Sequence, residues 1–332
     1  MRVSLFGTGR IGRLHARLLA GLEGVELVVA DPDTARAAEV AAETRSIAAT
    51  SPAAAFDGAD AVVVAAATDA HAELVRTAAA RGLATFCEKP LAQDLATSID
   101  VARAVEDAGI PFQLGFQRRF DAGYAEARRL LASGELGTLY GFALNGHDPE
   151  PPPAAYIPVS GGLFRDFSIH DFDIIRWLTG HEVDEVYATG SIRAFPVFAE
   201  YGDVDTAAVT LRMDDGAVGT LTVARHDPLG YDIRTELFGS RDSVSVGLGP
   251  RMPIRSVEPG VPPPAGPAWP NFLDRFGAAY AAELVAFVRV AAGAEPSPCT
   301  ARDGVQALRI AEAATRSLHE HRPVRLEEIP GG

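Results

Sequence analysis

Asp166, His170 and Asp173 are the residues of this chain whose types and spacing best suit proton transfer. They lie in the segment 161–180, four and then three residues apart. If this segment is helical from about Leu163, the three side chains share one stripe. A histidine flanked by carboxylates one turn away is suited to taking the proton of an alcohol. A solvated polar helix face is the alternative interpretation.

Lys89 and Arg118 are two cationic residues that follow predicted strands. Lys89 stands in Glu88-Lys89-Pro90. The carboxyl ends of parallel strands are where α/β sheets bind their ligands, although a surface lysine is the alternative. Arg118 and Arg119 follow another predicted strand among aromatic residues. They could form an ion-pair cluster between domains, or Arg118 could contact a substrate.

A glycine-rich turn at the start of the chain predicts a dinucleotide site. The turn is Gly7-Thr8-Gly9-Arg10-Ile11-Gly12. Its G-x-G-x-x-G pattern lets the backbone approach a pyrophosphate at a helix N-terminus. Asp31 follows 19 residues after Gly12, where a carboxylate accepts hydrogen bonds from the ribose hydroxyls and repels a 2′-phosphate. Pro32 comes next, and the pattern predicts NAD rather than NADP.

The elements that must position these residues alternate regularly over the first third of the chain. Short apolar runs fall at residues 3–6, 26–30, 61–66, 83–87 and 111–116, with helical spacing between them at 10–20, 34–43, 71–81 and 95–108. Such alternation of strand and helix predicts an α/β Rossmann domain, a doubly wound parallel sheet. We expect it to span residues 1–120.

The rest of the chain has a different pattern. Residues 124–133 have helical spacing, and alternating runs typical of strands fall at 206–212, 218–225, 231–238 and 243–246. Two helices are predicted near the end, at 272–292 and 301–319, which could pack back on the first domain. We therefore expect residues 121–332 to form an α+β domain with an open, mainly antiparallel sheet. Its second face, rich in Thr and Ala, is suited to packing on a symmetry mate.

Composition excludes several classes of protein. A net charge of −14 argues against binding a nucleic acid backbone. No window reaches the roughly 18 apolar residues of a membrane span, and no signal peptide is recognised. Cys87 and Cys299 lack the spacing of zinc ligands, and His170 has no second histidine at HExxH spacing. We expect a cytoplasmic protein that binds no metal.

Four ordered motifs carry a resemblance to a known family. They are GTGRIG at 7–12, CEKP at 87–90, GFQRRFD at 115–121 and DFSIHDFD at 166–173. Together they resemble the glucose–fructose oxidoreductase, inositol dehydrogenase and rhizopine catabolism (Gfo/Idh/MocA) family. Within it, the chain is most similar to bacterial inositol 2-dehydrogenases, and the segments 230–232 and 274–280 follow that pattern too.

The resemblance implies roles for individual residues. Lys89 matches the family's active-site lysine, His170 its catalytic base and Asp166 the partner of that base. The matching positions near the cofactor include Thr68, His71 and Glu88, and those that line the polyol pocket are Arg118, Asp148, Asp173, Tyr231 and Tyr280. The family also implies a homotetramer that forms through the open sheet.

The sequence leaves more than one substrate open. The resemblance implies oxidation of myo-inositol or a related inositol to the ketone, with hydride passing to nicotinamide C4. The segment 145–148 differs from that of well-known inositol enzymes, and 67–69 lacks a proline common in the family. A hexose, a sugar acid or an antibiotic-precursor sugar is therefore an alternative substrate, and a non-catalytic NAD-binding regulator is a second alternative.

Overall fold

The computed structural model describes residues 1–331, which divide into two compact units. The first unit comprises Met1–Gln117, Ala278–Gln306 and residue 331, and the second comprises Arg118–Gly277 and Ala307–Pro330. The late helices α9 (Phe272–Ala291) and α10 (Ala301–Glu320) each contribute residues to both units.

The first unit is built on a six-stranded parallel sheet of order β3-β2-β1-β4-β5-β6. The strands are β1 (Arg2–Phe6), β2 (Glu26–Ala30), β3 (Ile47–Ala48), β4 (Ala61–Val64), β5 (Ala84–Glu88) and β6 (Phe112–Gly115). The order reverses at β1, and ligands of doubly wound sheets bind at such a switch point. The turn after β1 is the glycine-rich turn of the sequence.

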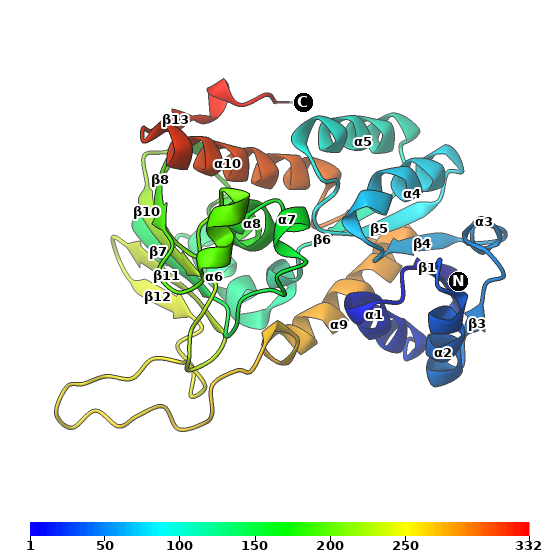
Figure 1. Ribbon diagram of the computed structural model, residues 1–332, viewed down its shortest axis with the longest axis horizontal. Helices are drawn as coiled ribbons and strands as arrows, with labels where there is room; N and C mark the ends of the chain where they lie inside the picture. Colours follow the sequence, from blue (N-terminus) through cyan, green and yellow to red (C-terminus); the bar gives the residue numbers. More distant parts are fainter. Residues whose placement is uncertain (332) are drawn as a thin grey trace. The chain divides into compact units, whose positions relative to one another are not determined.

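Helices cover both faces of this sheet (Figure 1). They are α1 (Arg10–Ala20), α2 (Thr34–Thr44), α4 (Thr68–Ala80), α5 (Leu95–Ala108), the short α3 (Pro52–Ala55) and part of α9. One face packs against α1, α2 and α9, in a core where Leu19, Val40 and Phe287 meet the strand residues. Because both faces are buried, β4 is apolar at every position.

The second unit contains a seven-stranded mixed sheet of order β12-β11-β7-β10-β9-β8-β13. The strands are β7 (Leu139–His147), β8 (Val183–Ser191), β9 (Thr206–Met213), β10 (Val218–Ala224), β11 (Asp232–Gly239), β12 (Ser243–Val246) and β13 (Val324–Arg325). All neighbouring pairs are antiparallel except β7 and β10. The parallel pairing brings the ends of β7 and β10 together, at His147 and Ala224.

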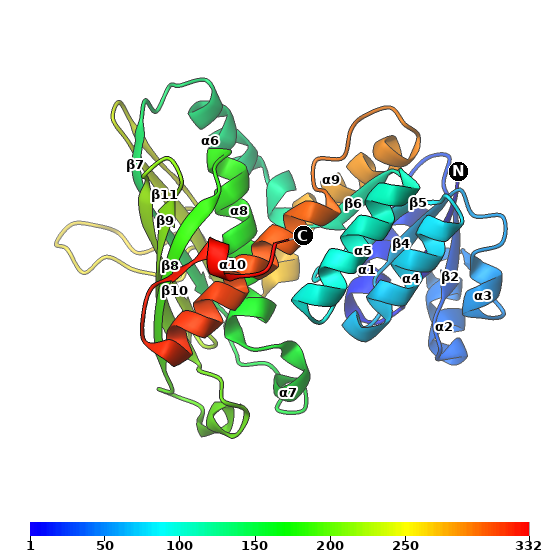
Figure 2. The same ribbon diagram turned by 90° about the horizontal axis from the view of Figure 1, so that it is seen from above.

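Only one face of this sheet is covered by helices, as Figure 2 shows. The covering helices are α6 (Ala122–Ala132), α8 (Ile169–Thr179) and the second-unit part of α10, and the shorter helical segments are η1 (Gln117–Phe120), α7 (Ile157–Ser160), η2 (Phe164–Ser168), η3 (Pro196–Tyr201) and η4 (Leu326–Glu328). The opposite face carries threonines and alanines together with exposed Tyr140, Tyr187, Val218 and Phe238.

The predicted fold class is confirmed, but parts of the second unit were missed. The strands β7 and β8 were not predicted, because neither alternates cleanly between apolar and polar residues. The helix expected from Leu163 begins as the π-helical turn η2 and becomes α-helical only at Ile169. The loop 247–271 has neither helix nor strand, and it projects from the sheet in Figure 1.

Two further findings bear on the class of protein. None of the described helices combines the length and apolar character needed to cross a lipid bilayer. Both cysteines are buried free thiols.

Candidate functional site

The glycine-rich turn leaves open space where a pyrophosphate would lie. Gly7 has a φ of +95°, and a Cβ there would lie 2.5 Å from the Ala65 carbonyl oxygen. A Cβ on Gly12 would lie 1.9 Å from the Gly7 oxygen, so α1 and β1 pack too closely for any side chain. At Gly9, the N-cap of α1, a Cβ would meet nothing within 4 Å. Gly7 and Gly12 therefore permit the turn, and Gly9 leaves room for phosphates at the N-terminus of the helix.

Asp31 lies at the end of β2, beside this turn, and its carboxylate is already well ordered. It accepts hydrogen bonds from Thr8 N at 2.8 Å, Thr8 Oγ1 at 2.9 Å, Asp33 N at 2.9 Å and Arg36 Nη2 at 2.7 Å. Burial alone would raise the pKa of Asp31, but the bonds from Arg36, Thr8 and Asp33 outweigh it and lower the pKa to about 2. Asp31 is thus a fixed anion where an NAD ribose would bind. The turn and this carboxylate together fit NAD.

The ends of β4 and β5 are tied together by His71. Its ring lies between the carbonyl oxygens of Pro90, 2.8 Å from Nδ1, and Ala66, 3.1 Å from Nε2. Burial lowers the pKa of His71 more than these two acceptors raise it. His71 therefore fixes the backbone around Lys89, whereas Thr68 begins α4 and is half-buried. A contact of either residue with the cofactor stays a prediction.

Glu88 and His15 form a second link at this edge. Glu88 Oε1 lies 2.6 Å from His15 Nε2, and Glu88 Oε2 accepts a hydrogen bond from the Lys89 amide at 3.3 Å. The His15 ring packs against Phe86 and Tyr280, with centroids 5.5 and 5.9 Å apart. Since His15 is on the helix of the glycine-rich turn, Glu88 couples that helix to the strand end that presents Lys89.

A third titratable residue belongs to the same cluster. Glu283, on α9, is fully buried, and neither carboxylate oxygen has a hydrogen-bond partner among the described residues. Burial, and then the charge of Glu88, raise the pKa of Glu283 well above its usual value. Burial thus favours the protonated, neutral form of Glu283 beside Glu88. Nothing in the sequence indicates a role for Glu283, because a lone glutamate in a late helix belongs to no recognisable motif.

In the second unit, Asp166 is held at both of its carboxylate oxygens. Oδ1 accepts a hydrogen bond from the Tyr156 hydroxyl at 3.0 Å, and Oδ2 accepts one from Arg225 Nη1 at 2.8 Å. Arg225 also lies 3.7 Å from Asp148 Oδ2. His170 is half-buried in the first turn of α8. The structure thus brings Asp148 and Asp166 to one arginine, and neither Tyr156 nor Arg225 was singled out from the sequence.

The two arginines after β6 form buried ion pairs with α8. Arg118 Nη1 lies 2.5 Å from Asp171 Oδ1, and Arg119 Nε donates to Asp173 Oδ2 at 2.9 Å. Burial raises the pKa of Asp171 despite Arg118. Tyr231 is buried near Arg118, and burial raises its pKa as well. These pairs lie within the second unit. A direct contact of Arg118, Asp173 or Tyr231 with substrate stays a prediction.

The segment predicted to carry Asp166, His170 and Asp173 on one helix stripe is not one regular helix. Asp166 lies in the π-helical turn η2, which changes its angular position relative to His170 and Asp173 in α8. Asp166 is bonded to Tyr156 and Asp173 to Arg119, and a pairing of Asp166 with His170 stays a prediction. Periodicity assumed one regular helix, and nothing in the sequence marks the wider turn.

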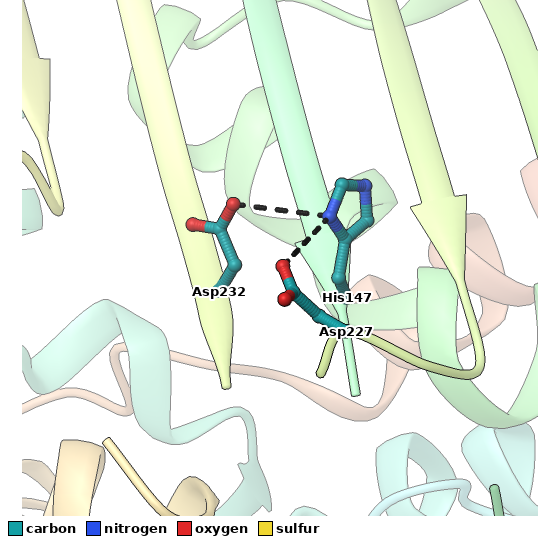
Figure 3. A group of neighbouring side chains, drawn as sticks. All are labelled: His147, Asp227 and Asp232. Atoms are coloured by element: carbon teal, nitrogen blue, oxygen red, sulfur yellow. Dashed lines mark ion pairs between the residues drawn. The ribbon is translucent and has the colours of Figure 1, made fainter. Parts of the chain in front are cut away.

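A histidine and two aspartates also meet at the end of β7 (Figure 3). His147 Nδ1 lies 3.7 Å from Asp227 Oδ2 and 3.8 Å from Asp232 Oδ2. These residue types can ligate a metal. However, Arg234 donates to both oxygens of Asp232, at 2.8 and 2.9 Å, and a cation would have to displace it. The arrangement fits an ion-pair cluster better than a metal site.

Two models of one protein family match this chain, one in each unit. The model of the oxidoreductase family with an NAD-binding Rossmann fold (GFO/IDH/MocA) matches residues 1–116, and that of the GFO/IDH/MocA C-terminal domain matches residues 124–245. A myo-inositol dehydrogenase from Streptomyces leeuwenhoekii is 41% identical over 321 residues, covering 96% of this chain and 97% of that protein.

Solved structures agree over nearly the whole chain. A myo-inositol dehydrogenase from Corynebacterium glutamicum matches with a TM-score of 0.90 at 36% identity, covering 98% of both chains. A scyllo-inositol dehydrogenase from Lactobacillus casei, with bound NAD(H) and scyllo-inositol, matches with a TM-score of 0.86 at 27% identity, covering 98% of this chain and 99% of that one. The chain therefore belongs to the GFO/IDH/MocA oxidoreductase family, as its motifs predicted.

Proposed function

We propose that this protein is an NAD-dependent dehydrogenase that oxidises one secondary alcohol of a cyclic polyol, myo-inositol or a related inositol, to the ketone. The observation that carries the proposal is the full-length match to a myo-inositol dehydrogenase in a chain that has Lys89, Asp166 and His170 at the family's motif positions. The Asp31 carboxylate beside the open turn at Gly9 supports NAD as the cofactor.

Each of the three residues has one task in the proposed reaction. His170 takes the proton of the substrate hydroxyl, and Asp166 stabilises the imidazolium that results. Lys89 donates a hydrogen bond to the same substrate oxygen and stabilises its developing negative charge. NAD, when bound, supplies the acceptor for the hydride that leaves the carbon. The alcohol thus loses one proton and one hydride, and the products are the ketone and NADH.

The charges of the second unit favour a neutral polyol over a sugar acid. Arg118 and Arg119 are neutralised by Asp171 and Asp173. Arg225 is shared by Asp148 and Asp166, so one negative charge is in excess around it. A substrate carboxylate placed there would be repelled. Hydroxyl groups, by contrast, can donate to these carboxylates, and analogues without them would leave buried polar groups unpaired.

Two further proposals concern the assembly and its setting. We expect a homotetramer that associates through the helix-free face of the second sheet, because that face exposes Tyr140 and Val218 among small residues. We also assign the cofactor domain to residues 1–120 and the substrate domain to residues 121–332, in a cytoplasmic protein. Light scattering coupled to size-exclusion chromatography would measure the mass, and a monomer would contradict the assembly.

A polyol panel tests the activity. The protein is incubated with NAD and, in separate reactions, myo-inositol, scyllo-inositol, glucose, glucuronate and cyclohexanol, and NADH absorbance at 340 nm is followed. We expect inositols to exceed cyclohexanol and glucuronate by several orders of magnitude in kcat/KM. Activity on glucose but not on inositols would keep the chemistry and change the substrate. Cofactor binding with no turnover of any polyol would favour a non-catalytic regulator.

A further inference from the structure

Arg225 is a buried arginine that lies directly against the carboxylate proposed to support the base. Its side chain is 2% exposed. Nη1 donates to Asp166 Oδ2 at 2.8 Å, while the Tyr156 hydroxyl donates to Oδ1 at 3.0 Å. With both oxygens bonded, the plane of the Asp166 carboxylate is fixed. Of these two donors, only Arg225 carries a charge.

The sheet fixes the backbone on both sides of Arg225. The residue follows β10, whose last residue, Ala224, accepts a hydrogen bond from Asp148 N at 3.0 Å. Arg225 N in turn donates to the carbonyl of Asp205 at 2.8 Å. The backbone at Arg225 is therefore held by the segments that flank β7 and β9. Such anchoring is what a residue needs in order to orient another side chain.

The charges around Arg225 show why Asp166 depends on it. Burial lowers the pKa of Arg225, but Asp166 and Asp148, with a smaller effect of Asp203, raise it by more. The net result is a raised pKa. Three carboxylates thus act on one guanidinium. Without that guanidinium they would repel one another in a poorly solvated site, and at least one would take up a proton. Asp166 and Asp148 would be affected most, because they lie nearest.

We propose that Arg225 is a positioning residue for the oxidation, which keeps Asp166 ionised and correctly oriented so that Asp166 can stabilise the protonated form of His170. This role rests on the proposed function of Asp166 and His170. Arg225 itself acts through Asp166, since its Nε and Nη2 are buried away from solvent.

The pH profile of kcat/KM separates this role from a purely structural one. We expect Arg225→Gln to lower kcat on the order of 10–100-fold, because the substitution removes one charged hydrogen bond to Asp166. The acid limb of the profile should move to higher pH, because removing a nearby cation raises the pKa of the groups that must be deprotonated for the reaction. Arg225→Lys should restore the position of the limb and part of kcat, since it keeps the charge but loses the planar fork.

A second buried arginine provides the matched control. Arg176 pairs with Glu182 at 2.6 Å in the same unit, and Arg176→Gln should lower stability without moving the pH profile. Circular dichroism and NAD titration would be run on every variant. If Arg225→Gln gave the wild-type profile, or one shared with Arg176→Gln, the positioning role would be refuted.

A double-mutant cycle tests the pairing without any polyol. We expect Arg225→Gln and Asp166→Asn each to lower the thermal midpoint, and the double variant to melt no lower than the less stable single variant. Additive losses would overturn the pairing, even in an active enzyme. If the losses of the variants were coupled but the wild type oxidised no polyol, the proposed function would be overturned and the pairing would stand.

Discussion

The buried acid Glu283 leads to a prediction about how stability depends on pH. Folding moves its carboxyl group from water to a buried site beside Glu88, with no hydrogen-bond partner among residues 1–331, so burial and then this neighbour raise its pKa. Between the unfolded and folded pKa values, the folded state holds a proton that the unfolded state has lost. The wild type therefore loses stability as pH rises through that window.

Glu283→Gln removes this titration and keeps nearly the same shape. The magnitude follows from linkage, since one proton contributes about 1.4 kcal/mol per pH unit while pH lies between the two pKa values. For each pH unit of that window, the free energy of unfolding of the variant should therefore increase by about 1.4 kcal/mol relative to that of the wild type. The contributions of other groups cancel in the difference, except where Glu88 responds to the loss of its neighbour.

Urea denaturation at pH 6, 7 and 8 and at one protein concentration measures this difference. Glu23→Gln is the control, because it makes the same chemical change at an exposed glutamate. Its difference from the wild type should not change with pH. If the difference for Glu283→Gln were equally flat, the folded protein would not hold the extra proton on Glu283, and the inferred rise in the pKa of this carboxyl group would be wrong.

Three further predictions concern the cofactor and the chemistry. Asp31→Ala should weaken NAD much more than NADP, by roughly 1.5–3 kcal/mol for each ribose hydrogen bond lost; equal kinetics of the wild type with both cofactors would contradict this. His170→Ala should lower turnover on the order of 10²–10⁴-fold with NAD affinity preserved in fluorescence titration, while His319→Ala, an exposed control, should change neither. Tyr156→Phe removes one hydrogen bond to Asp166 and should lower kcat by about 2- to 10-fold, and no change in steady-state kinetics would show that the bond does not matter for the reaction.

The first unit could be predicted from the sequence because its signals are local. Each parallel strand is a continuous apolar run, and a turn such as Gly7–Gly12 has its physical reason within six residues. In the second unit, the important contacts join distant parts of the chain. The sequence gives no sign that Arg225 meets Asp166, 59 positions away, or that Arg119 meets Asp173, 54 positions away. Parallel pairing of β7 and β10 also brings Asp148 beside Arg225, and β7 was missed.

The partners of the aspartates in the segment 166–173 decide which of them can take part in the chemistry. Asp171 and Asp173 are each about 1% exposed and paired with an arginine that is equally buried. A carboxylate fully buried in an ion pair has little room to contact a substrate or an imidazole as well. Asp166 is 15% exposed, and it lies in the π-helical turn that ends just before His170. This difference in burial supports the proposed role of Asp166 beside His170, whereas Asp171 and Asp173 hold α8 against Arg118 and Arg119.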